Sequence, residues 1–221
     1  MSPSPRIICR ELPSFETSNL DSIRRAFQNS AACELGQPWL RQPEPDFAPA
    51  QAHAGWRGGS LLLFVELNDP DIFTRATADN QNFWELGDTF EIFLRPKEQK
   101  SYLEVHVAPN NMHLQLRFAG AETAQRVRKA GSFADVLISG EVFQSKTWVL
   151  PEARRWFIFA DIPAGSVSEK SNPLPGSTWL FSFSRYEYAR DRKEPVISST
   201  SSHTIPDFHC QKEWGVMKFA F

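Results

Sequence analysis

Hydrophobic and polar residues alternate through much of the chain after residue 60, and the segment FWELGDTFEIFLRP at 83–96 shows this pattern well. Successive side chains of a β-strand point to opposite faces. Phe90, Ile92 and Leu94 therefore share one face, which is predicted to face the core. Glu91 and Phe93 share the other face. Strand propensity alone does not favour a carboxylate in mid-strand, so Glu91 faces either solvent or a ligand.

Further segments have the apolar runs or the alternation of strands. They are SLLLFVELND (60–69), SYLEVHVAP (101–109), MHLQLRF (112–118), ADVLISGEVF (134–143), RRWFIFADIP (154–163), TWLFSFSRYEY (178–188) and EWGVMKFAF (213–221). The second and third of these are joined by a Pro-Asn-Asn turn and predict a hairpin. Its polar face is expected to carry Glu104, His106, His113 and Arg117, opposite an apolar face.

Only one segment has clear helical periodicity. In SNLDSIRRAFQN, from Ser18, residues Leu20, Ile23 and Phe27 fall on one face behind a Ser or Asn cap. Residues 36–59 show little periodicity and are expected to form a long loop. Strands and helices do not alternate, which argues against a parallel α/β sheet.

The pattern predicts an all-β fold, a two-sheet antiparallel β-sandwich of jelly-roll or immunoglobulin-like type. We expect roughly nine or more strands and one short N-terminal helix. Residues 1–221 are expected to form a single domain, in which residues 1–55 are the less typical part.

The composition of the chain limits the classes of partner that we expect. The 221 residues carry a formal net charge of −2, whereas a nucleic-acid partner requires a clustered basic face. No stretch approaches the ~20 apolar residues of a membrane span. The start has no signal-peptide pattern, so a cytoplasmic location is expected, or secretion if a leader was removed. Cys9, Cys33 and Cys210 fit neither a disulfide framework nor a zinc motif, and reduced thiols are expected.

Catalytic motifs are sparse. The histidines lack metal-ligand spacing, so no metal site is predicted, and the hydroxyl-rich SSTSSH at 198–203 is interpreted as a loop or strand edge. Glu91 and Glu104 are expected on adjacent strands facing the same way. Because glycoside hydrolysis uses two carboxylates about 5–10 Å apart, a sugar-active enzyme using this pair is one alternative.

The loop PDIFTRATADNQNFW at 70–84 offers a different chemistry. A run of amides and an acid ends at Asn82, Phe83 and Trp84, and sugars need this combination of polar groups and an aromatic face. The other interpretation is a polar loop whose tryptophan plugs the end of the sandwich.

Several motifs together resemble the family 9 carbohydrate-binding modules first described on xylanases. They are VELND (65–69), WELGDTFEIFL (84–94), YLEVHVAPN (102–110), RYEY (185–188), SSTS (198–201) and DFHCQKEWGVMKF (207–219). The resemblance covers about residues 55–221. It implies a non-catalytic β-sandwich that binds glycan ends, or a mono- or oligosaccharide, in a slot between two aromatic side chains.

The resemblance also implies site residues. Trp84 matches the first aromatic wall, Asp69 the acid that ends the preceding strand, and Glu91 the acid after the turn. Asn82 comes from the polar loop. His106 and, more loosely, Arg117 occupy the region of a basic or amide group that reaches the sugar.

No second tryptophan is found at the late position. Tyr186 or Tyr188 replaces it, or the slot is open on one side. No cofactor is expected, although some members of the family bind structural calcium, for which the sequence assigns no ligands.

Two further alternatives remain, a haem-binding domain of DOMON type and a ligand-free interaction domain. Haem requires an axial Met/His pair, and Met112 and Met217 are the downstream methionines. The sequence does not predict the oligomeric state.

Overall fold

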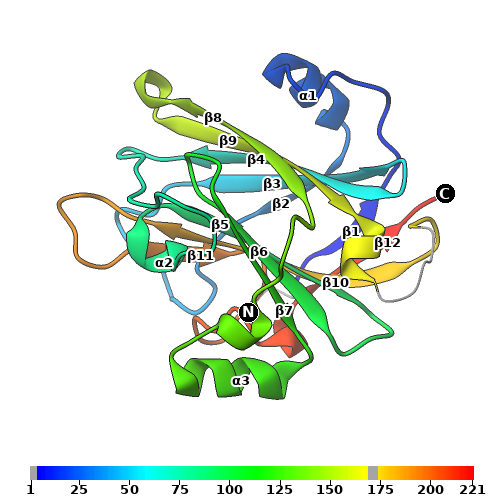
Figure 1. The fold of residues 1–221 in the computed structure, drawn as a ribbon. Coiled ribbons are helices and arrows are strands. Elements are labelled where there is room, and N and C mark those ends of the chain that lie inside the picture. The colour runs from blue at the N-terminus through cyan, green and yellow to red at the C-terminus, as the bar shows by residue number, and fades with distance from the viewer. Residues whose placement is uncertain (1–3, 169–173) are drawn as a thin grey trace.

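The fold is that of a computed structural model, which describes residues 4–168 and 174–221. Within these residues, two β-sheets pack face to face (Figure 1). The larger sheet contains β1 (Arg6–Cys9), β12 (Gly215–Phe219), β10 (Thr178–Glu187), β5 (Thr89–Pro96), β6 (Tyr102–Val107) and β7 (His113–Phe118) in this order, and β11 (Val196–Ser199) pairs with β10. The smaller sheet contains β2 (Ala31–Glu34), β3 (Ala50–Arg57), β4 (Ser60–Asn68), β9 (Arg155–Pro163) and β8 (Gln144–Leu150). The predicted two-sheet sandwich is confirmed.

Short helices cover the outer faces and the edges of the sheets. They are α1 (Leu20–Phe27), α2 (Phe83–Leu86), α3 (Ala121–Ala130), α4 (Ala164–Val167) and the 3-10 turns Ala134–Val136, Pro151–Ala153 and Gln211–Glu213. In Figure 1, α1 lies outside the smaller sheet and α3 outside the larger one, so the molecule has four layers. None of the described helices is both long and apolar enough to cross a membrane.

The main hydrophobic core lies between the sheets. Phe90, Ile92 and Leu94 of β5 are fully buried there, as their alternation predicts. Met217 of β12 is also fully buried in this core, so it packs as an apolar side chain rather than facing a cavity. Burial of side chains of this size stabilises the fold by about 1.5–3 kcal/mol each.

Each outer face carries a smaller hydrophobic cluster. On the smaller sheet, α1 packs Ile23 and Phe27 against Phe64 and Phe157. The predicted helix is confirmed, and its cap is Asn19, whose side-chain oxygen accepts from the Ser22 amide at 2.9 Å. On the larger sheet, a second cluster lies beneath α3 and the segment 206–214.

The predicted loop at 36–59 is wrong in its second half, because residues 50–57 form β3. Ala50, Ala52 and Ala54 are buried and alternate with more exposed polar residues, but alanine is a weak strand signal. The hairpin to β4 turns at Gly58 and Gly59, whose φ angles are 57° and 86°. Left-handed conformations at two successive residues form the tight turn of a two-residue hairpin, in which glycine is not strained.

The structure differs from the sequence-based prediction in three other places. The predicted strand at 134–143 is a 3-10 turn and loop, and the strand follows at 144–150. Helix α3 was not predicted, because its sequence AETAQRVRKA presents few apolar residues. The hairpin of β6 and β7 has no uniformly polar face, because its register places Glu104 beside Leu116 and His106 beside Leu114.

Candidate functional site

A cleft of about 330 Å³ opens on the outer face of the larger sheet, beside α3. Its lining residues come from β5, β6, β7, β10, α2, α3 and the segment 206–209. Trp84, Phe133, Tyr186 and Phe208 provide aromatic surface. The strand residues Glu91, Phe93, Glu104, Leu116 and Phe118 form the floor, and Asn82, Glu85, Arg128 and Ser132 provide polar groups elsewhere in the lining.

The position of the Trp84 side chain depends on a turn that requires glycine. Phe83 of α2 is buried, whereas the next residue, Trp84, is half-buried and lines the cleft. Gly87 follows α2 with a φ of 139°, and a Cβ at this position would lie 2.6 Å from the carbonyl oxygen of Phe73. Only glycine fits this close approach without strain, which explains the Gly-Asp turn between Trp84 and β5.

Trp84 is held in place by contacts on several sides. Its ring lies edge-on to His106 and to Phe133, with centroid distances of 5.6 and 5.8 Å. The Tyr188 hydroxyl donates to its carbonyl oxygen. Asp88 fixes the end of the turn by accepting from the amides of Phe73 and Tyr188. The indole therefore has a defined orientation at the cleft wall.

The cleft floor carries a buried row of acids and histidines. The register of β5 and β6 places Glu91 directly opposite His106. Nδ1 of His106 lies 3.4 Å from Oε1 of Glu91, and its Nε2 lies 2.8 Å from Oε1 of Glu104. The other oxygen of Glu104 lies 3.6 Å from Nε2 of His209, whose Nδ1 is 2.7 Å from the Tyr102 hydroxyl. Five titratable side chains thus form one continuous row.

Burial dominates the electrostatics of this row. It raises the pKa of Glu91 to about 7, with the nearby Glu104 carboxylate acting in the same direction and His106 opposing it. Burial also raises the pKa of Glu104. The pKa values of His106 and His209 are lowered, again mainly by burial. Near neutral pH the floor is therefore poised between neutral and anionic forms.

Arg128 of α3 contributes a cationic group to the lining of the cleft. Its guanidinium forms an ion pair with Asp207 at 2.6 Å, which links α3 to the segment that carries Phe208 and His209. It also lowers the pKa of Glu91 and Glu104, against the larger effect of burial.

The structure brings four of the eight sequence-predicted site residues directly to the cleft: Trp84, Glu91, Asn82 and Tyr186. A fifth, His106, lies beneath the floor, between Glu91 and Glu104. Two other side chains of the polar loop accept hydrogen bonds from backbone amides and do not line the cleft. Gln81 accepts from an amide of the loop, and Asp79 accepts from the His113 amide.

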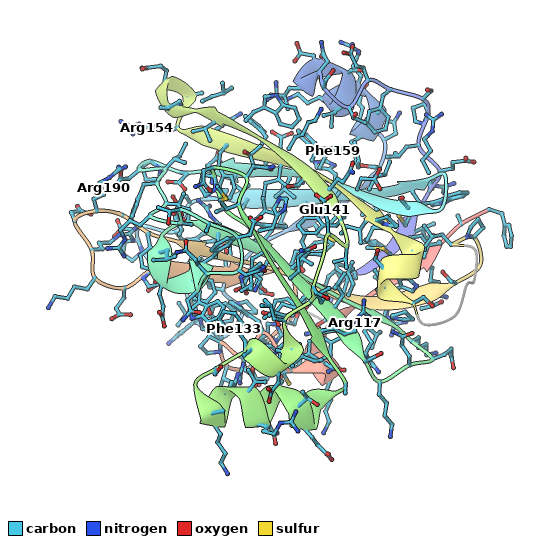
Figure 2. All side chains as sticks on the ribbon, in the orientation of Figure 1. Arg117, Phe133, Glu141, Arg154, Phe159 and Arg190 are labelled. Carbon is cyan, nitrogen blue, oxygen red and sulfur yellow. The ribbon has the colours of Figure 1, made fainter. Side chains whose placement is uncertain are left out.

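The other three residues lie outside the cleft lining. Asp69 is 1% exposed and forms an ion pair with Arg185 at 2.9 Å, so its carboxylate is used in the interior. Odd-numbered residues of β7 point to the face opposite Leu116, so Arg117 points away from the cleft. Its guanidinium donates a hydrogen bond to the Ser166 carbonyl. Figure 2 shows Arg117 apart from Phe133. Tyr188 is used to hold the Trp84 backbone.

Sequence reasoning missed Arg128, Phe133, Phe208 and His209 as lining residues. Two of them are on or next to α3, which had not been predicted. Phe208 and His209 belong to the DFHC motif, which is part of the family resemblance. The motif therefore marks this segment, but the sequence alone assigns these two residues no role.

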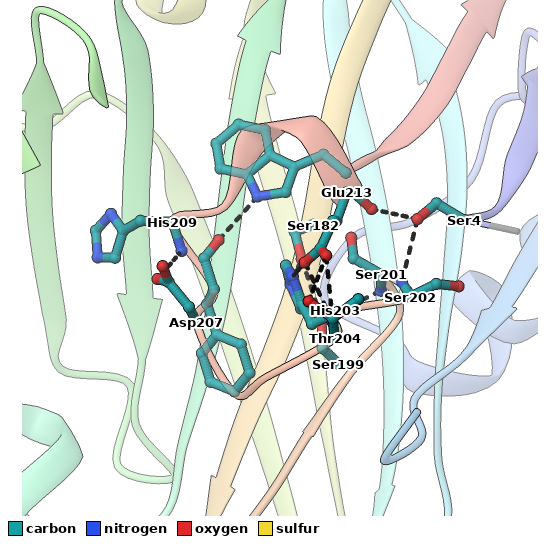
Figure 3. Close-up of polar contacts among 12 residues, drawn as sticks. Ser4, Ser182, Ser199, Ser201, Ser202, His203, Thr204, Asp207, His209 and Glu213 are labelled. Carbon is teal, nitrogen blue, oxygen red and sulfur yellow. Dashed lines mark hydrogen bonds and ion pairs between the residues drawn. The ribbon is translucent and has the colours of Figure 1, made fainter. Parts of the chain in front are cut away.

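A second histidine network anchors the late loop (Figure 3). Nε2 of His203 lies 3.5 Å from the Ser182 hydroxyl and its Nδ1 lies 3.1 Å from Glu213, an order that resembles a hydrolase triad. Ser182 and His203 are both fully buried, so no substrate reaches the hydroxyl. The network instead fixes the loop that carries Phe208 and His209 over the sheet.

No protein-family model matches the chain, and no curated protein matches it significantly. Solved structures do match. A proposed carbohydrate-binding protein from Bacteroides uniformis ATCC 8492 has a TM-score of 0.75 at 14% identity, over 98% of this chain and 99% of that one.

A family 9 carbohydrate-binding module from Caldicellulosiruptor kristjanssonii, solved in complex with cellotriose, has a TM-score of 0.65 at 17% identity, over 97% of this chain and 93% of that one. A structure of a family 9 module from the same organism in complex with glucose gives 0.62 at 17%, over 96% and 93%. At these identities the similarities establish the fold alone. The fold predicted from the family 9 resemblance is confirmed.

Proposed function

We propose that this protein is a non-catalytic carbohydrate-binding protein, whose cleft holds one end of a glycan, or a mono- or oligosaccharide, against the Trp84 indole. The observation that carries the proposal is the meeting of a half-buried indole and a buried strand carboxylate, Glu91, in one cleft. Structures with the same fold have been solved in complex with cellotriose and with glucose.

The two groups complement the two kinds of surface on a pyranose. The ring's C–H face is apolar and loses little by stacking on an indole, which has few rotamers to immobilise. Its hydroxyl edge donates to a carboxylate, and hydrogen bonds to an ionised acceptor are shorter and stronger than neutral ones. Glu91 is held at a fixed depth by a central strand, so the acceptor is preorganised.

The size of the cleft favours a short ligand. Its volume of about 330 Å³ is near the lower end of the roughly 300–1,000 Å³ that is typical of small-molecule pockets. Tyr186 and Phe208, whose ring centroids are 5.8 Å apart, take the place of a second tryptophan wall. We therefore expect binding of one or two sugar rings with modest affinity.

The test is a monosaccharide and oligosaccharide screen by thermal shift, with calorimetry for each hit. In Trp84→Ala, affinity for a hit should fall at least about tenfold, which corresponds to ~1.4 kcal/mol. The melting temperature should change by only a few degrees, since the indole is half-buried. The matched control is Trp148→Ala, because Trp148 is equally half-buried but belongs to β8 of the smaller sheet.

Two results would contradict the proposal. One is a screen in which no saccharide binds. The other is a large loss of stability in Trp84→Ala with unchanged affinity, which would make the indole a plug of the sandwich rather than a platform.

A second candidate function is hydrolysis of a glycosidic bond by Glu91 and Glu104. It is favoured by the placement of both carboxylates in one cleft, with one oxygen of each within 4.8 Å. Retaining glycosidases hold their two carboxyl groups about 5–5.5 Å apart. Turnover of aryl glycosides with a bell-shaped pH profile, lost in Glu91→Gln, would favour this function, and a binding protein would release no product.

A further inference from the structure

The cleft floor carries a compact set of metal-ligand atoms. One oxygen of Glu91, one oxygen of Glu104 and one ring nitrogen of His106 all lie within 4.8 Å of one another. Glu91 is in the middle of β5, and the other two are in the middle of the adjacent strand β6. Their backbones are therefore fixed by strand pairing on both sides, as a preorganised site requires.

The contact between His106 and Glu91 has the geometry of two ligands of one ion. Nδ1 of His106 and Oε1 of Glu91 are 3.4 Å apart and form no hydrogen bond. Two donors bound about 2.0–2.1 Å from one ion at a tetrahedral angle are separated by about 3.3 Å. The spacing is thus long for a hydrogen bond and correct for shared coordination.

Two buried atoms of this set lack hydrogen-bond partners. Among the described residues, Nδ1 of His106 and Oε2 of Glu104 are buried and have no hydrogen-bond partner. The His106 side chain is fully buried, and that of Glu104 is 5% exposed. Most buried polar atoms in folded proteins are paired, so two orphaned acceptors in one cluster point to a missing cation or donor.

The charge of the cluster also lacks a close counterion. The cation that lines this cleft is Arg128, whose guanidinium is half-exposed and paired with Asp207. Two other buried acids, Asp69 and Glu187, both contact the buried guanidinium of Arg185. Glu91 and Glu104 have no such direct partner among the described residues, and a dication would supply the missing charge.

The donor types select the ion. An imidazole nitrogen with two carboxylate oxygens suits zinc, manganese, ferrous iron or cobalt, whereas calcium and magnesium prefer oxygen ligands throughout. His209 and Tyr102 support the set from the side, because Nε2 of His209 lies 3.6 Å from Glu104 and its Nδ1 contacts the Tyr102 hydroxyl. Partners of this kind orient ligands in metal sites.

We propose that Glu91, Glu104 and His106 bind one divalent transition-metal ion at the floor of the cleft. Three protein ligands leave coordination positions open, and the cleft is the side from which a ligand oxygen reaches them. This site goes beyond the proposed carbohydrate binding and does not depend on it, although both use the same cleft.

The test uses the protein of residues 1–221, stripped of metal with a chelator. Cobalt(II) is titrated while its visible absorption is followed, and zinc then displaces it. We expect one ion per chain, bound at micromolar concentration, and no binding of calcium or magnesium under the same conditions. Glu104→Gln and His106→Gln should each weaken cobalt binding at least tenfold.

Two matched controls should leave cobalt binding unchanged. Glu66→Gln removes a half-buried acid of β4 in the smaller sheet, and His113→Gln removes a half-buried histidine that does not line the cleft. Should the Glu104 or His106 variants fail to fold, the NMR signals of the imidazole nitrogens in the wild-type protein test the metal site. Zinc should shift the His106 signals and leave those of His53 and His113 in place.

Absence of saturable binding by zinc, cobalt and manganese would overturn the proposal. So would equal binding by the Glu104 and His106 variants and the wild type, or zinc shifts confined to other histidines. The two proposals fail separately, because Trp84→Ala should lose saccharide binding and keep the metal, whereas His106→Gln should lose the metal.

Discussion

Glu91 and Phe93 project from the same face of β5, and their roles differ sharply. Phe93 packs in the hydrophobic cluster beneath α3, whereas Glu91 brings a carboxylate into the same buried surface. Burying an acid is costly unless it is paired. Its raised pKa reflects that cost. The ligand or the ion proposed for the cleft would offset it.

The carboxylate of Glu91 should therefore matter more for binding than for folding. In Glu91→Gln, saccharide affinity should fall about tenfold or more, because one charge-assisted acceptor becomes a neutral amide. The unfolding transition should stay near that of the wild type, since glutamine keeps the shape. Calorimetry checks this, with Glu66→Gln, a half-buried acid on β4 of the smaller sheet, as the control. Unchanged affinity in Glu91→Gln would contradict a role at the floor.

A second group of buried acids predicts how stability depends on pH. Burial, followed by the neighbouring Asp69 carboxylate, raises the pKa of Asp88 to about 8, and burial raises the pKa of Glu187 to about 7. In the unfolded chain, such acids titrate near 4. Between these values, folding takes up protons, so the stabilisation is complete below pH ~4 and is lost as pH rises through the folded pKa values.

These acids should accordingly lower the free energy of unfolding as pH rises from 5 to 8, by at most about 1.4 kcal/mol per pH unit for each acid. Below pH ~6.5 the buried histidines, whose pKa values are lowered, act in the opposite direction, so the net fall is expected between pH ~7 and ~8. Denaturant unfolding at a series of pH values measures this slope. Asp88→Asn should flatten it, and Glu11→Gln, at an exposed acid, should not. Stability that rises from pH ~7 to ~8 would be the opposite result.

At the scale of elements, short connections set the site more than the strands do. The turn after α2 places Trp84 on the cleft wall, and it depends on the positive φ of Gly87. Helix α3 and the segment 206–209 then close the cleft from the other side. Strands supply the floor, and these connecting segments supply the walls.

Gly87→Ala tests the turn. The added Cβ meets the Phe73 carbonyl oxygen at 2.6 Å in a conformation that L-residues avoid, so stability should fall by ~1–3 kcal/mol. Saccharide affinity should fall too, because Trp84 moves with the turn. Gly36→Ala is the control, since a Cβ there meets nothing within 4 Å. Thermal unfolding measures the stability and calorimetry the saccharide affinity. Equal stability and equal affinity in the two variants would show that the turn is not restrained.

Sequence patterns predicted the elements unevenly, for physical reasons. The alternation around Phe90, Ile92 and Leu94 was decisive because both the period and the apolar character were strong. β3 was missed because three of its buried positions are alanines. α3 was missed because only Ala124 and Val127 face the cluster. In both elements the tertiary partner, rather than local propensity, determines the structure.

Over the whole molecule, the sandwich and part of the site could be predicted, while the assembly of the cleft could not. Trp84 and Glu91 are close in sequence and belong to one motif, so their proximity was predictable. Arg128 and His209 reach the cleft through long-range packing that no local pattern reveals. Asp69 has the right sequence position but is used by Arg185 in the interior.

The proposed platform for a saccharide is the Trp84 indole, and an NMR spectrum of the indole signals of the seven tryptophans tests this role. The Trp84 signal is assigned by its absence in Trp84→Phe. On addition of a saccharide found in the screen, this signal should shift most and saturate with the calorimetric affinity. A Trp84 signal that stays in place while saccharide binds, with the shifts confined to other indoles, would contradict the account.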